Sequence, residues 1–124
     1  MQGARVEDLI GQTLVNVERF GDDEIIFVTD RGEKYKMYHA QDCCESVTIE
    51  DIVGDLSDLV GEPILLAEEV KGAEPPVRAV DPWKDSFTWT FYKFATRKGY
   101  VDLRWYGSSN GYYSEEVSFH KCCA

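Results

Sequence analysis

Apolar and polar residues alternate along much of the chain, and short segments rich in glycine and charged residues interrupt the alternation. In the first third this pattern predicts strands over Leu14–Phe20, Glu24–Asp30 and Glu33–Tyr38. Gly21-Asp22-Asp23 and Asp30-Arg31-Gly32 lie between them and are typical of hairpin turns, because glycine supplies the positive φ that tight hairpins need. The N-terminal part is therefore expected to form antiparallel hairpins.

The C-terminal third carries the clearest alternation. Strand periodicity is present over Phe87–Ala95, Tyr100–Tyr106 and Tyr112–Phe119. The segments between them, Arg97-Lys98-Gly99 and Asn110-Gly111, are expected to be turns. Asn-Gly between two alternating segments is a strong hairpin signal. The pattern predicts a three-stranded antiparallel meander.

The middle of the chain fits two kinds of element. Ser46–Val53 matches both strand and helix periodicity, and Gly54 favours a strand that ends there. A short helix is then expected over Asp55–Val60, whose first residue is a suitable N-cap. A further strand is expected over Ile64–Val70, followed by a long, proline-containing loop over Lys71–Asp85.

A second short helix is expected over Val6–Thr13, since Val6, Leu9 and Ile10 fall on one side of it. Together these elements predict an α+β fold that is predominantly antiparallel β-sheet, built of hairpins and a C-terminal meander, with one or two short helices. A chain of 124 residues can bury a core without disulfides or metal, so residues 1–124 are expected to form a single domain.

The charge of the chain narrows the classes of partner. The formal net charge is −10, which disfavours direct binding to nucleic acid or to an anionic membrane. No apolar run approaches the roughly 18 residues of a membrane span, and the N-terminus lacks the layout of a signal peptide. We expect a cytoplasmic monomer or homodimer whose partner is a protein, and a basic surface on that partner suits the charge.

One segment, Tyr38–Glu45, gathers most of the reactive side chains. Its candidate binding residues are His39, Gln41, Asp42 and Glu45, and its candidate metal ligands are His39, Asp42, Cys43 and Cys44. Zinc accepts imidazole, thiolate and carboxylate ligands, but adjacent cysteines on extended backbone point to opposite faces. The alternative is a tight turn in which the carboxylates accept hydrogen bonds from the backbone.

A cysteine nucleophile with His39 as its base is the enzymatic interpretation of the same segment. The neighbouring carboxylates oppose it, because negative charge raises the pKa of a thiol. The four cysteines are expected to be reduced thiols, as is usual in the cytosol. The segment therefore favours a non-enzymatic protein.

Four aromatic residues and one asparagine form the second candidate site. The residues concerned are Trp105, Tyr106, Asn110, Tyr112 and Tyr113. Tyrosine and tryptophan are enriched at the energetic centres of protein interfaces, whereas ordinary cross-strand packing in a hairpin is the alternative explanation.

Two motifs resemble an uncharacterised family of small phage and bacterial proteins. They are Tyr38-His39-x-Gln41-Asp42-Cys43-Cys44-Glu45 and Trp105-Tyr106-Gly107-x-Ser109-Asn110-Gly111-Tyr112-Tyr113-Ser114. The resemblance implies a phage accessory protein that acts in the cytoplasm of a bacterial host.

Charge, aromatic residues and resemblance together suggest a non-enzymatic binding protein, such as a phage-encoded inhibitor of a host defence protein. No cofactor is expected on this hypothesis. The alternative is a small metal- or ligand-binding domain built on His39, Asp42, Cys43 and Cys44, with zinc as the ion.

Overall fold

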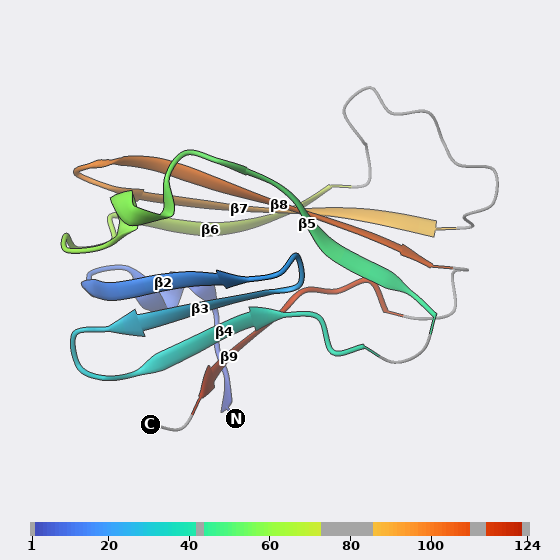
Figure 1. Cartoon of the computed structure of the whole chain (residues 1–124), viewed down its shortest axis with the longest axis horizontal. Coiled ribbons are helices and arrows are strands. Elements are labelled where there is room, and N and C mark those ends of the chain that lie inside the picture. The colour runs from blue at the N-terminus through green and yellow to red at the C-terminus, as the bar shows by residue number, and fades with distance from the viewer. Residues whose placement is uncertain (1, 42–43, 73–85, 110–113, 123–124) are drawn as a thin grey trace.

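The computed structural model describes residues 2–41, 44–72, 86–109 and 114–122. These residues form two antiparallel sheets that lie face to face (Figure 1). The first sheet has the order β1 (Gln2–Gly3), β9 (Ser118–Cys122), β4 (Lys34–Tyr38), β3 (Glu24–Thr29), β2 (Leu14–Phe20). The second has the order β5 (Ser46–Val53), β8 (Gly99–Ser109), β7 (Ser86–Thr96), β6 (Leu66–Gly72).

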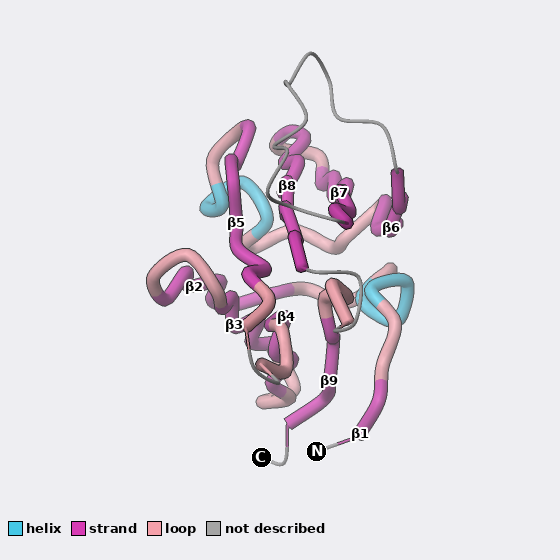
Figure 2. Tube along the Cα trace, turned by 90° about the vertical axis from the view of Figure 1, so that its right-hand side faces the viewer, coloured by secondary structure: helices cyan, strands magenta, loops and turns pink. Residues whose placement is uncertain are grey.

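A single apolar core fills the space between the sheets. Figure 2 shows the two sheets from the side. Phe27 of the first sheet meets Phe94 of the second, with ring centroids 5.6 Å apart. The indole N–H of Trp105 donates to the sulfur of Met37 across the same layer, at 3.3 Å. Every second residue of β3, and of β8 as far as Trp105, is buried in this layer, as the strand period requires.

Seven of the eight predicted strands are confirmed, and two of them, Leu14–Phe20 and Ser46–Val53, have the predicted bounds. The strand predicted over Tyr112–Phe119 is wrong in its bounds, because residues 114–117 form no strand and β9 begins at Ser118. The predicted helices over Val6–Thr13 and Asp55–Val60 are wrong. Single 3₁₀ turns stand there instead, η1 (Val6–Leu9) and η2 (Leu56–Leu59), and the described residues contain no α-helix. The fold is therefore all-β rather than α+β, and no described helix is long and apolar enough to cross a membrane.

The helical periodicity failed because one turn of apolar residues is too short to form an α-helix cooperatively. The capping signal was nevertheless correct at the second site. The Asp55 carboxylate accepts a hydrogen bond from the Ser57 backbone N–H at 2.9 Å. This hydrogen bond lowers the pKa of Asp55 below its usual value.

The predicted C-terminal meander is also only partly correct. β7 and β8 form its first hairpin, but β9 pairs with β4 and β1 in the other sheet. The chain crosses between the sheets over residues 114–117, and Phe119 then stacks on Tyr35 in the core at 5.4 Å between centroids. The predicted Asn110-Gly111 turn lies outside the described residues.

Gly54 ends β5 for a steric reason. Its φ is +102°, and a Cβ at this position would lie 2.5 Å from the Tyr100 carbonyl oxygen. Only glycine combines that backbone conformation with so close an approach. The prediction from the sequence that the strand ends at Gly54 therefore has a steric basis.

The core contact between the sheets yields the first prediction. Phe27→Ala should lower the free energy of unfolding by about 3–5 kcal/mol, because it removes a fully buried ring and leaves a cavity. Phe20→Ala, at a side chain 46% exposed on β2, should change it by less than about 0.5 kcal/mol. Urea unfolding of both variants measures the difference, and equal losses would contradict the assignment of the core.

Candidate functional site

β4 and β5 place the two ionisable residues of the Tyr38–Glu45 segment against each other. His39 directly follows β4, and Glu45 directly precedes β5. The His39 Nε2 lies 2.8 Å from the Glu45 Oε2, and the two side chains are 3% and 0% exposed. Gln41 adds its amide, which donates to the Glu45 carbonyl oxygen at 2.6 Å and to Oε1 at 3.2 Å. We call His39, Gln41 and Glu45 the joint.

The hydrogen bond made by the second ring nitrogen of His39 determines how many protons the His39–Glu45 pair carries. Its Nδ1 lies 2.6 Å from the Glu116 carbonyl oxygen. A carbonyl oxygen only accepts, so Nδ1 must carry a hydrogen. The contact between Nε2 and Glu45 therefore holds a second proton, either as imidazolium and carboxylate or as imidazole and carboxylic acid. The pair is neutral overall in both forms, as a buried pair should be.

The joint connects distant parts of the chain rather than presenting a reactive group. Through His39 the end of β4 is bonded both to the start of β5 and to residue 116 in the crossing segment. A substrate cannot reach two side chains so fully buried. The structure thus brings together three of the predicted residues, with His39 and Gln41 as side-chain partners of Glu45.

The described members of the predicted zinc set are not arranged as ligands. Both nitrogens of His39 are engaged with protein oxygens. Cys44 is disulfide-bonded, which differs from the expected reduced thiol, while Cys122 is a reduced thiol. Asp42 and Cys43 lie outside the described residues. No group of three potential ligands that could hold a metal ion occurs within the described ranges.

The predicted aromatic site divides between the core and the surface. Trp105 is fully buried between the sheets, on the core-facing side of β8. Tyr106, its neighbour, points the opposite way and is half-buried. Asn110, Tyr112 and Tyr113 lie outside the described residues.

Tyr106 belongs to a group of aromatic residues on the outer face of the second sheet, the face that points away from the first sheet. We call Phe87, Trp89, Phe91 and Tyr106 the aromatic cluster. Ring centroids of Trp89 lie 4.8 Å from Tyr106 and 6.1 Å from Phe91. Phe87 stacks on Tyr106 at 6.5 Å. None of the four belongs to the core between the sheets.

An exposed valine on one neighbouring strand and an arginine on the other flank the aromatic cluster. Val70 of β6 pairs with Phe91 and is 41% exposed. On the other side Phe91 pairs with Arg104 of β8. The Trp89 indole nitrogen is buried and has no hydrogen-bond partner, although a buried indole N–H normally has one.

Sequence periodicity could not have identified this cluster as external. β7 places Phe87, Trp89 and Phe91 on one face and Tyr92 and Phe94 on the other. Since both faces are aromatic, alternation shows that the strand has two apolar faces without showing which one is covered.

Fold and sites define a two-sheet antiparallel β domain with a buried polar joint and an aromatic outer face. The chain belongs to the family described as a domain of unknown function, DUF7448, whose model matches residues 7–119. No curated protein and no solved structure matches the chain.

The joint yields the second prediction. Glu45→Ala and His39→Ala should each lower the free energy of unfolding by about 3–5 kcal/mol, because each leaves a buried polar partner unsatisfied. The double variant should lose clearly less than the sum of the two. Glu18→Ala, at an exposed position on β2, is the control and should be nearly neutral.

The same samples test the zinc alternative. Chelator should leave the thermal midpoint of the wild-type protein unchanged, because protein groups alone hold the joint. If a structural metal ion were bound, its removal would lower the midpoint, since metal binding is coupled to folding. A midpoint that falls substantially with EDTA in the wild type, and not in His39→Ala, would contradict the role of the joint.

Proposed function

We propose that the chain is a non-enzymatic protein-binding domain and that the outer face of the second sheet is its contact surface. The partner is a bacterial protein with a basic surface. The inhibition of a host defence protein by a phage-encoded domain is the specific form of this proposal. It draws on the resemblance of the two motifs to small phage and bacterial proteins.

The observation that carries the proposal is the aromatic cluster on the outer face of the second sheet, where Phe87, Phe91 and Tyr106 are half-buried around the buried Trp89. An antiparallel sheet with one face on a core normally turns polar side chains to water on the other. Here that face carries Phe87, Trp89, Phe91 and Tyr106 with Val70 beside them. Contiguous apolar surface of this kind is typical of interaction sites.

The residue types also support a protein partner. Tryptophan, tyrosine and arginine are the residues most enriched at the energetic centres of interfaces. The outer face combines Trp89, Tyr106 and Arg104 within one register of β7 and β8. Charged residues such as Lys93 and Asp102 lie farther along the same two strands, which gives the arrangement of apolar centre and polar rim found in interfaces.

The net charge of the chain indicates the sign of the charge on the partner's surface. At −10 the chain repels acidic surfaces and attracts basic ones over a Debye length. Electrostatic attraction of this kind increases the association rate more than the affinity. Binding is therefore expected to weaken as salt is raised.

The third prediction uses two exposed valines, one on each sheet. Val70→Arg places a bulky cation beside the aromatic cluster, whereas Val15→Arg makes the same change at a residue 54% exposed on β2. Tagged wild-type protein is used to capture its partner from a bacterial lysate, and the affinity of the identified partner is then measured for all three proteins.

Val70→Arg should weaken the complex at least about tenfold, equivalent to 1.4 kcal/mol, and Val15→Arg should leave it unchanged. Both variants should unfold at the wild-type urea concentration. Equal affinity of all three proteins, or a loss confined to Val15→Arg, would place the contact surface elsewhere.

A further inference from the structure

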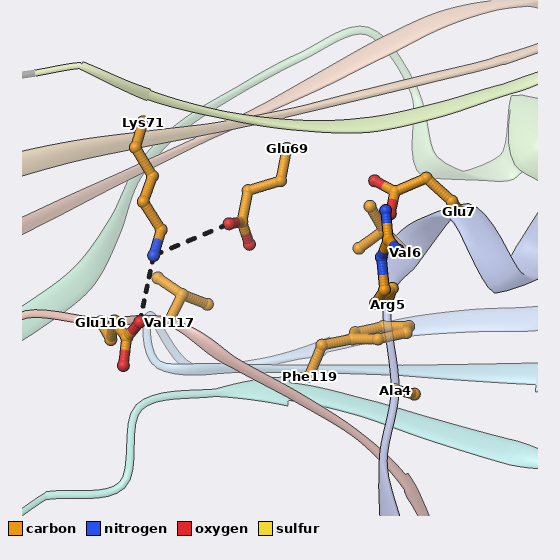
Figure 3. Close-up of a pocket in the computed structure, with 9 residues that line it drawn as sticks. All are labelled: Ala4, Arg5, Val6, Glu7, Glu69, Lys71, Glu116, Val117 and Phe119. Carbon is orange, nitrogen blue, oxygen red and sulfur yellow. Dashed lines mark hydrogen bonds and ion pairs between the residues drawn. The ribbon is translucent and has the colours of Figure 1, made fainter.

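A pocket of about 380 Å³ opens beside β6, where η1 and residues 116–119 approach that strand (Figure 3). We call it the edge pocket. Its apolar side is formed by Val6, Val117 and Phe119, all of which also belong to the core. Its volume is at the lower end of the range of ligand pockets and suits one side chain or a small molecule.

One charged group of the pocket, the Glu69 carboxylate, is held in place from the core. Glu69 projects from β6 on its core-facing side, and its Oε2 accepts the Tyr92 hydroxyl at 2.6 Å. Tyr92 is fully buried, and burial raises the pKa of its hydroxyl. The hydroxyl donates this hydrogen bond from a fixed position in the core, so it orients the Glu69 carboxyl group in the pocket.

Carboxylates outnumber cations around the pocket. Glu7, Glu69 and Glu116 face Arg5 and Lys71, which leaves one negative charge in excess. Both cations already have partners. The Arg5 Nε lies 2.9 Å from the Glu7 Oε2, and the Lys71 Nζ lies 3.1 Å from the Glu116 Oε1.

The second oxygen of Glu69 has only a long contact with a cation of the pocket. Its Oε1 lies 3.9 Å from the Lys71 Nζ, which is beyond hydrogen-bond distance. Glu69 is also the least exposed of the five charged side chains, at 32%, against 36% for Glu7, 46% for Lys71, 69% for Glu116 and 80% for Arg5. The carboxylate of Glu69 is thus the charged group that solvent screens least.

We infer that the edge pocket binds the side chain of an arginine or lysine of the partner protein. The aliphatic part of that side chain lies against Val117 and Phe119, and its cation reaches Glu69. A cation over the Phe119 ring gains a further electrostatic attraction. This inference rests on the proposed function, because it supplies a specific contact for a basic partner.

The position of β6 links the pocket to the proposed contact surface. Successive side chains of a strand point to opposite faces. Val70 therefore lies on the outer face, while Glu69 and Lys71 on either side of it line the pocket. A partner that covers Val70 has its own surface at the mouth of the pocket.

The test uses small probes and does not need the partner. Nα-acetyl-arginine amide is titrated into the protein while the methyl resonances of Val6 and Val117 are followed by NMR. Nα-acetyl-citrulline amide, which has the same shape without the charge, is the matched ligand control. Glu69→Gln is the test variant, since its amide oxygen still accepts the Tyr92 hydroxyl and the fold is retained. Glu68→Gln, on the other face of the same strand, is the matched control variant.

The arginine probe should shift both methyl resonances, and the citrulline probe should not. Glu69→Gln should weaken binding at least tenfold, whereas Glu68→Gln should leave it unchanged. Equal shifts from both probes, no shifts at all, or no effect of Glu69→Gln would overturn the inference. Tighter binding of 1,4-diaminobutane than of the arginine probe would overturn it in favour of a free amine ligand. If the Val70→Arg result holds while the arginine probe fails, only the pocket assignment is wrong.

Discussion

Every β-strand has two faces, and the packing of the core of this protein determines which face of each strand points away from the core. In β7 the largest fully buried side chains are those of Tyr92 and Phe94, and Phe94 packs against Phe27 of the first sheet. Because side chains alternate, Trp89 and Phe91 must then lie on the outer face. A shift of one residue in the pairing would exchange the two sets. The external aromatic cluster is thus a consequence of the same pairing that builds the core.

The same alternation in β6 joins two surface features that otherwise have different chemistry. Val70 extends the aromatic face, while Glu69 and Lys71 turn toward the edge pocket. The hydroxyl of Tyr92 crosses from the core to hold Glu69, so the position of the pocket carboxylate depends on the packing of the second sheet. Apolar contact and charge recognition therefore meet along one strand, as is common at interfaces with an apolar centre and a polar rim.

The sequence predicts the strands well because alternation and turn glycines are local signals, as at Gly54. It fails at η1 and η2, where apolar spacing over a single turn does not distinguish a 3₁₀ turn from an α-helix. It also fails for β9, since periodicity does not say which sheet a strand joins. In the candidate site, too, local features could be predicted from the sequence and long-range contacts could not. The Tyr38–Glu45 segment was expected to act as a turn stabilised by carboxylates, but the pairing of His39 with Glu45 and with residue 116 depends on the crossing segment.

The central claim is that the outer face of the second sheet contacts the partner, and site-specific cross-linking tests it most directly. Phe91 and Phe20 are matched phenylalanines on the outer face of the second sheet and on β2 of the first sheet. Each is replaced in turn by the photo-reactive p-benzoylphenylalanine, and bacterial cells that express the protein are illuminated. The account predicts a covalent adduct with the partner from position 91 and none from position 20. An adduct from position 20 alone, or binding that persists without any adduct from position 91, would contradict it.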